Sequence, residues 1–260
     1  VRKEGEIAMN RLIKAEFYRI RKSTKFTMWI LLVTFLTFII PVLTLTLSPE
    51  KPEYNITNFV QCYMSNSGTL TYMLVPMLAA IVAVMPYDYK TSNYMVITGN
   101  SIHKILVSNI ITVFVSVMLP IAAAFAVLTV VFYLIGGRGD MSGEALIRNS
   151  VPVFIGLSHL IIVSEMIAGI VRHIAAVGAV LVRWMVVDMV IPMVVYFFLG
   201  DGGHAVENSY NWLASTVFTN EERAFEAAYN KLILCQLLAL VIEVALWYVI
   251  SCIRHRKRNY

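Results

Sequence analysis

Four charged residues interrupt long apolar runs of this chain and are its first candidates for chemistry: Glu165, Arg183, Asp188 and Glu243. At the centre of a membrane-spanning helix each costs on the order of 2.5 to 3.5 kcal/mol, so we expect all four to face protein or water. Counted from a turn at residues 172–173, Glu165 and Arg183 lie at a similar depth of about 10 to 15 Å, which predicts an ion pair between them. Two roles stay open for this charged network. Either it holds the helices together, or it belongs to a pathway for a substrate or a proton.

Residue patterns for catalysis do not occur in the sequence. The five histidines fall on separate segments, and neither HExxH nor GxSxG is found. A phosphate-binding loop of the form GxxxxGKS or GxxxxGKT is also missing. The three cysteines, Cys62, Cys235 and Cys252, do not have the spacing of metal ligands. We therefore expect neither an enzyme, nor a metal site, nor a directly bound cofactor, and nothing in the sequence indicates a nucleic-acid partner.

The elements that must position the four charges are apolar helices. Hydrophobic residues make up 58% of the 260 positions and charged residues 14%, a composition typical of integral membrane proteins. Nearly uncharged runs of about 20 residues, the length of a membrane-spanning helix, predict six spans. They cover residues 26–47, 68–87, 105–135, 151–171, 174–199 and 232–252. The predicted fold is all-α, with one six-helix transmembrane domain over residues 26–252.

The orientation of the spans follows from the distribution of charge. With the N-terminus inside, the cytoplasmic segments hold 15 Lys and Arg and the external loops hold five, whereas nine acidic residues lie outside against four inside. Because positive residues near span ends stay in the cytoplasm, both termini are predicted to face the cytoplasm of a multi-pass cell-membrane protein. The segment "SPEKPEYNITNFVQCYMSNSG" is expected to be a polar external loop, and residues 200–231 are expected to hold short external helices.

A basic amphipathic helix is predicted before the first span, over residues 9–25. Apolar side chains recur there at helical spacing, and Arg11, Lys14, Arg19 and Arg21 occupy the other faces. Such a helix lies along the inner membrane surface, with Phe17 and its apolar neighbours in lipid and the cations near acidic headgroups. It either only orients the protein or also contacts a cytoplasmic partner. Residues 1–8 look unlike the rest and are set apart, and residues 253–260 form a basic cytoplasmic tail.

The stretch "MPYDYKTSNYMVITGNSIHK" lies between the second and third spans and would face the cytoplasm. It begins with an acidic residue, Asp88, passes through the small residues of "TGNS" and ends in a basic pair. Together with the basic helix "LIKAEFYRIRKS" and the six spans, this order resembles ABC-2-type permeases, the membrane subunits of bacterial ATP-binding-cassette exporters. The resemblance implies a coupling helix near residues 89–98. Its candidate ATPase-coupling residues are Asp88, Tyr94, Met95, Ile97, His103 and Lys104.

The resemblance implies that the chain is one half of a transporter. A separate ATPase subunit would bind ATP and Mg²⁺, and a second permease half would complete a homodimer or a heterodimer. The nearest likeness is to peptide-export and antimicrobial-peptide-immunity permeases, which implies a hydrophobic or amphipathic substrate such as a peptide. A cluster of exposed aromatic and branched residues in the cytoplasm is expected to be covered by another surface. That surface is either the ATPase or the membrane. Two alternatives stay open: a non-transporting sensor or assembly factor, and a gradient-driven carrier that uses the intramembrane charges.

Overall fold

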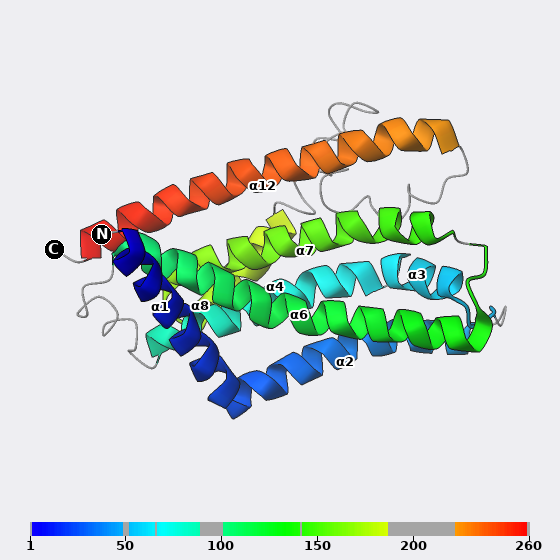
Figure 1. Cartoon of the computed structure of the whole chain (residues 1–260), viewed down its shortest axis with the longest axis horizontal. Helices are drawn as coiled ribbons and strands as arrows, with labels where there is room; N and C mark the ends of the chain where they lie inside the picture. Colours follow the sequence, from blue (N-terminus) through cyan, green and yellow to red (C-terminus); the bar gives the residue numbers. More distant parts are fainter. Residues whose placement is uncertain are drawn as a thin grey trace.

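The computed structural model describes residues 2–48, 52–65, 67–88, 101–140, 142–186 and 222–258, and over these ranges the chain is helical without any strand. Figure 1 shows the helices lying mostly alongside one another, with α1 set at an angle to them. The helices are α1 (Arg2–Lys22), α2 (Thr24–Leu47), α3 (Ile56–Ser65), α4 (Ser67–Asp88), α6 (Ile102–Gly136), α7 (Gly143–Val171), α8 (Ala175–Arg183) and α12 (Glu222–Arg258). The all-α prediction is confirmed for this part of the chain.

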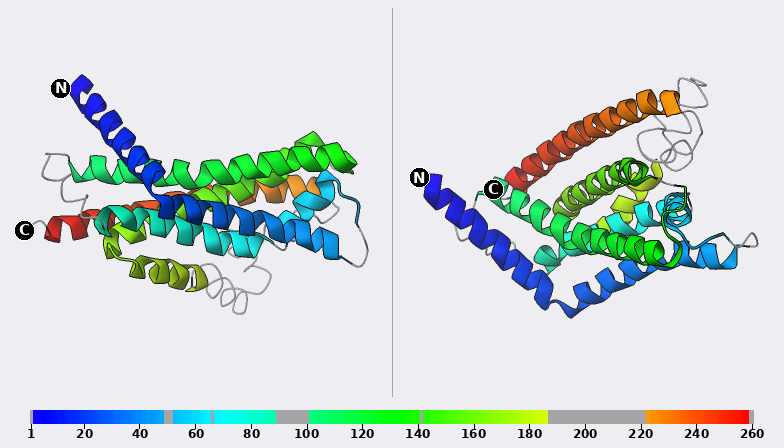
Figure 2. Two further views of the ribbon diagram at one scale, coloured as in Figure 1. Left: turned by 90° about the horizontal axis from the view of Figure 1, so that it is seen from below. Right: turned by 45° about the vertical axis from the view of Figure 1, so that its right-hand side comes forward.

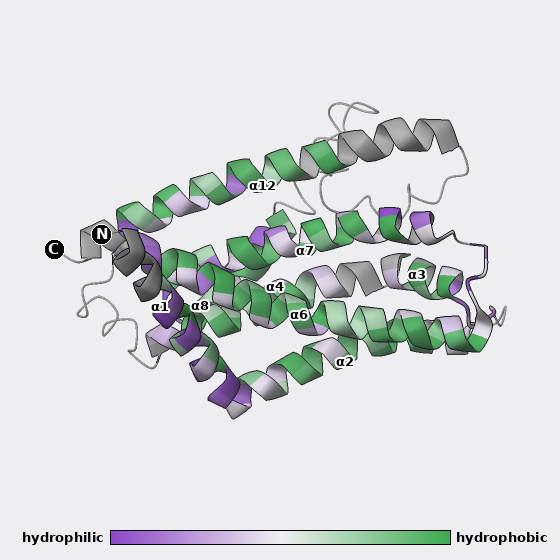
Figure 3. Ribbon diagram, viewed as in Figure 1, coloured by the Kyte–Doolittle hydropathy of each residue, from purple (hydrophilic) through white to green (hydrophobic). Residues whose placement is uncertain are grey.

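Four of the described helices are long and apolar enough to cross a membrane. Their apolar portions are Thr24–Leu47, His103–Gly136, Ser150–Val171 and Leu237–Arg254. Two shorter apolar stretches, Thr71–Tyr87 and Ala175–Val186, coincide with the second predicted span and with the first half of the fifth. Figure 3 shows apolar residues along nearly the whole length of α2, α6 and α7. The chain thus has the character of a multi-pass membrane protein, and a count of six spans stays a prediction.

Helix α7 lies at the centre of the bundle. Its apolar portion is 78% buried, whereas those of α2 and α6 are 28% buried and that of α12 only 6%. Helix α7 packs against α4, α6, α8 and α12. On α4 the small side chains of Ala79, Ala80 and Ala83 are almost fully buried, and small residues let two helix backbones approach closely. In the view of Figure 2 that is turned about the vertical axis, α12 lies along the outside of the bundle.

The segment predicted to be a polar external loop contains a packed helix, α3. Phe59 and Val60 have no solvent exposure and Tyr63 has 3%, because aromatic rings from neighbouring helices cover them. The ring centroids of Phe59 and Phe132 are 4.7 Å apart, and those of Tyr63 and Phe38 are 5.2 Å apart. This part of the loop prediction is wrong. Its apolar residues recur at helical spacing, at positions 56, 59, 60 and 63, but within a run too short to read as a span.

Helix α1 is longer than the predicted helix and begins within the segment that was set apart. It packs along α6, and the side chains of Glu16 and Ile20 are 3% exposed. Burial raises the pKa of the Glu16 carboxyl, and an ion pair with Arg19 one turn later opposes that rise. The apolar stripe is therefore partly covered by protein, where contact with lipid was predicted. Ser23 separates α1 from α2 and caps α2 by accepting a hydrogen bond from the backbone N–H of Phe26 at 3.4 Å.

Candidate functional site

An ion pair between Arg183 and Glu243 joins α8 to α12. The Arg183 Nε donates to Glu243 Oε1 at 2.9 Å, and its Nη2 donates to Oε2 at 2.6 Å. This is the two-pronged geometry in which a planar guanidinium matches a carboxylate best. The Arg183 side chain is 6% exposed and that of Glu243 is 17% exposed, so both charges lie largely out of contact with solvent.

Two further side chains also contact this carboxylate. The Nε2 of His159, in the middle of α7, lies 2.9 Å from Glu243 Oε2, and the Nε1 of Trp247 donates to Oε1 at 3.1 Å. Trp247 follows Glu243 by one helical turn, whereas His159 approaches from another helix with only 2% exposure. We call Arg183, Glu243, His159 and Trp247 the Glu243 cluster. It ties α7, α8 and α12 together, and each carboxylate oxygen accepts from two donors, which is how a buried charge is stabilised.

The predicted ion pair between Glu165 and Arg183 is wrong. Arg183 binds Glu243, whereas Glu165 is 2% exposed and its Oε2 has no hydrogen-bond partner among the described residues. Residue counting gave only the depth of each charge, but a contact also requires the right helix face. Glu165 follows His159 by six residues, which turns it by about 240° around α7 and away from the cluster. Asp188, the remaining member of the predicted network, lies outside the described residues.

Sequence reasoning missed His159 and Trp247 as members of the cluster. His159 stands inside the apolar run 151–171, where a buried imidazole needs a polar partner. Trp247 stands one turn after Glu243, which is the spacing of side chains that meet on one helix face. Both signals were present in the sequence, but neither says which carboxylate the side chain meets.

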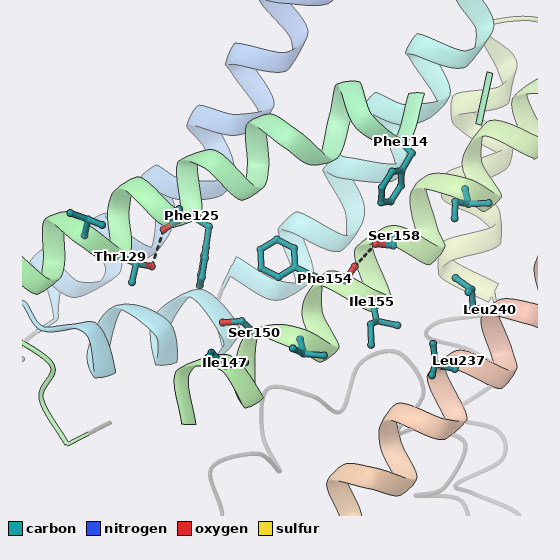
Figure 4. A pocket seen from close by; sticks show the side chains of 14 residues that line it. Phe114, Phe125, Thr129, Ile147, Ser150, Phe154, Ile155, Ser158, Leu237 and Leu240 are labelled. Atoms are coloured by element: carbon teal, nitrogen blue, oxygen red, sulfur yellow. Dashed lines mark hydrogen bonds between the residues drawn. The ribbon is translucent and has the colours of Figure 1, made fainter. Parts of the chain in front are cut away.

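An apolar groove of about 790 Å³ runs between α6, α7 and α12. Figure 4 shows Phe114 and Phe125 from α6, Phe154 and Ile155 from α7, and Leu237 and Leu240 from α12 around it. Two of the hydroxyl groups on its wall are used within their own helices. Thr129 Oγ1 donates to the Phe125 carbonyl at 2.8 Å, and Ser158 Oγ donates to the Phe154 carbonyl at 2.6 Å. The groove consequently offers an apolar surface to anything that enters it.

The groove lies beside the Glu243 cluster. Ser158 on its wall directly precedes His159, and Leu240 lies three residues before Glu243 on α12. Helices α7 and α12 therefore supply residues to the groove and also hold the ion-paired charges next to it. A change in the packing of these two helices would alter the groove and the cluster together.

The predicted ATPase-coupling residues are described only at the two ends of their segment. Asp88 is the last residue of α4, and Tyr94, Met95 and Ile97 lie outside the described residues. At the other end, Ser101 caps α6 by accepting from the backbone N–H of Lys104 at 3.4 Å. Both ends lie at the end of the bundle where the chain termini are found (Figure 1).

Contacts with other helices hold both ends of this segment. The Tyr87 hydroxyl lies against α7, where a Cβ added at Gly169 would be 3.5 Å from its oxygen, and the Arg172 guanidinium sits 5.4 Å from the Tyr87 ring. His103 Nδ1 is hydrogen-bonded to the Tyr248 hydroxyl of α12 at 2.5 Å. The segment is thus attached to α7 at one end and to α12 at the other.

The residues predicted for the membrane-surface helix divide into two groups. Arg11, Lys14 and Arg21 are exposed on α1, whereas Phe17 is half-buried. Arg19 does not join the exposed cations, because its guanidinium pairs with Glu16 on the side facing α6. The exposed face of α1 is therefore basic, and Figure 3 shows it as the most hydrophilic of the helices coloured by residue.

The rest of the described chain adds no metal site, since nowhere in it do three His, Cys, Asp or Glu side chains come together. No family model, curated protein or solved structure matches the chain. The resemblance to ABC-2-type permeases therefore stays a prediction.

Proposed function

We propose that the chain is the permease subunit of an ATP-driven exporter that moves a hydrophobic or amphipathic molecule, with a peptide as the first candidate. The observation that supports this most directly is how the segment between α4 and α6 is anchored. One end contacts α7 through Tyr87 and the other contacts α12 through His103. Helices α6, α7 and α12 are the three that line the apolar groove. A force applied to this segment therefore acts on the walls of the groove.

Helix α12 would transmit this force into the bundle. It receives His103 at Tyr248 and holds Glu243 five residues earlier, within the same continuous helix. Because the Glu243 cluster ties α12 to α7 and α8, a shift of the start of α6 is passed on to both. The energy comes from a separate ATPase, since the sequence has no phosphate-binding loop of its own.

In this proposal the groove receives the apolar face of the substrate. Phenylalanine side chains from α6 and α7 and leucine side chains from α12 give it large apolar contacts. Six spans form one half, and a second permease half is expected to complete the path.

The test places charge on the proposed coupling surface. The double substitution Met95→Glu with Ile97→Glu is expected to abolish co-purification of the ATPase and ATP-dependent transport in reconstituted vesicles, because a buried interface does not tolerate two unpaired carboxylates. A matched control, Tyr18→Glu, adds a charge to the 66% exposed side chain on α1 and is expected to change neither readout. Retained binding and transport in the double variant would contradict the proposal.

One observation favours a gradient-driven carrier as the second candidate, namely the buried carboxyl of Glu165, whose Oε2 has no hydrogen-bond partner among the described residues. Vesicles that contain the purified chain alone separate the two candidates. Uptake driven by a proton gradient without any ATPase would favour the carrier, whereas transport only with ATP and an ATPase subunit would favour the exporter. A chain that transports under neither condition would be a non-transporting sensor or assembly factor.

A further inference from the structure

Glu165 is a deeply buried acidic side chain of the described bundle. It lies on α7 within the apolar portion Ser150–Val171, with 2% exposure. Its Oε2 accepts and donates no hydrogen bond among the described residues, and none of the Lys, Arg or His described there forms an ion pair with it. Buried polar atoms in folded proteins nearly always have partners, so an exception of this kind points to an unseen small ligand.

A second buried polar group lies against the same part of α7. The Tyr87 hydroxyl of α4 is buried and also has no hydrogen-bond partner among the residues described. It lies over Gly169, one helical turn after Glu165, so the two groups face the same strip of α7. Leu106 of α6 closes this strip on one side, with its Cδ2 4.0 Å from a Cβ added at Gly169.

The charged side chains on the surrounding helices contact other groups. Arg172 at the end of α7 stacks over the Tyr87 ring, and Glu16 and Arg19 of α1 pair with each other. On α8 and α12, Arg183 and Glu243 form the ion pair described above, and His103 of α6 contacts Tyr248. None of these charged side chains forms an ion pair with Glu165.

We propose that Glu165 is a proton-binding site. An isolated carboxylate removed from water is far less stable than the neutral acid, so the carboxyl keeps its proton while α4 and α7 stay packed. Tyr87 directly precedes Asp88, where α4 meets the segment that we assign to ATPase coupling. Separation of α4 from α7 would admit water to the carboxyl and release the proton. The site does not require that the chain be an exporter.

The first test uses a hydrophobic carbodiimide on the full-length protein in detergent micelles. A protonated carboxyl adds its O–H across one C=N bond of dicyclohexylcarbodiimide, nothing leaves, and the adduct rearranges to a stable N-acylurea. Peptide mass mapping is expected to find the adduct at Glu165, with a yield that falls as the pH is raised, and Glu165→Gln is expected to lose it completely. Glu243 is the internal control and should stay unlabelled, because Arg183 and His159 hold it as a carboxylate.

The second test compares the neutral isosteres of both glutamates. Since glutamine resembles a protonated carboxyl, Glu165→Gln is expected to keep the melting temperature within about 3 °C, whereas Glu243→Gln is expected to lower it by roughly 10 °C. Absence of the Glu165 adduct at every pH would overturn the proposal, as would a fall in melting temperature for Glu165→Gln as large as that for Glu243→Gln. Both readouts are independent of transport, so failure of the exporter proposal leaves them unchanged.

Discussion

Glu243 and Glu165 lie in the same helical bundle and are surrounded in opposite ways. Glu243 accepts hydrogen bonds or ion pairs from Arg183, His159 and Trp247, whereas Glu165 has no partner for its Oε2 among the described residues. The first carboxylate is stabilised as a charge and cross-links three helices. The second has no such cross-link among the described residues, which fits the proton-binding role proposed for it. Burial alone therefore does not decide whether a carboxyl is ion-paired.

The most direct test of the contrast between Glu243 and Glu165 is a substitution of Glu243. Glu243→Ala leaves the largely buried Arg183 without its carboxylate, and we expect a loss of about 3 to 5 kcal/mol of unfolding free energy. Thermal unfolding followed by circular dichroism in detergent micelles measures the loss. The double variant Arg183→Met with Glu243→Leu removes both charges and is expected to recover most of it. A double variant as unstable as Glu243→Ala would mean that the cluster does not act through its charge pair.

A smaller effect is expected from the histidine of the same cluster. His159→Ala removes one donor to Glu243 and leaves a gap in α7, so we expect a loss of about 1 to 3 kcal/mol. His159→Gln can still donate from its amide and is expected to lose about half as much. Melting temperatures of the two variants, measured side by side, test this order. Equal losses would show that packing, and not the hydrogen bond, accounts for the effect.

The smallest change in unfolding free energy is expected for a substitution of Tyr87. Tyr87→Phe removes a hydroxyl group that has no described partner, so the unfolding free energy should change by less than about 0.5 kcal/mol. The matched control is Tyr248→Phe, which removes the hydrogen bond to His103 and should cost about 1 kcal/mol. A loss for Tyr87→Phe as large as for the control would show that its hydroxyl has a partner, and the contrast between the two glutamates would weaken.

The predicted helices agree with the structure where the pattern was long and regular. The runs at residues 26–47, 105–135, 151–171 and 232–252 each lie within one long helix, and the first begins two residues from the observed start of α2. Besides α1, which begins earlier than predicted, two segments that the structure describes differed from prediction. Helix α3 is too short to be recognised from hydropathy, and residues 222–231, expected among short external helices, are the first turns of α12.

The site was harder to predict than the helices. Glu165, Arg183 and Glu243 were recognised as charges that needed protein around them, and the structure buries or largely covers all three. Their partners were not recognised, since Arg183 was matched to Glu165 by depth alone. The rotation of each helix about its axis and its lateral neighbours decide which side chains meet, and neither quantity follows from counting residues within one helix.

The sequence by itself determined that this chain is built of apolar helices and that each charge within them must be shielded from lipid. Both conclusions depend on local quantities, namely the hydropathy of a run of residues and the free energy of moving one charged group out of water. Only the tertiary structure decided that α12 brings Glu243 to Arg183 and His159 while α4 brings a tyrosine, and no cation, to Glu165. The physical reason is that burial is a property of one residue, whereas pairing requires two helices to present the right faces at the same depth.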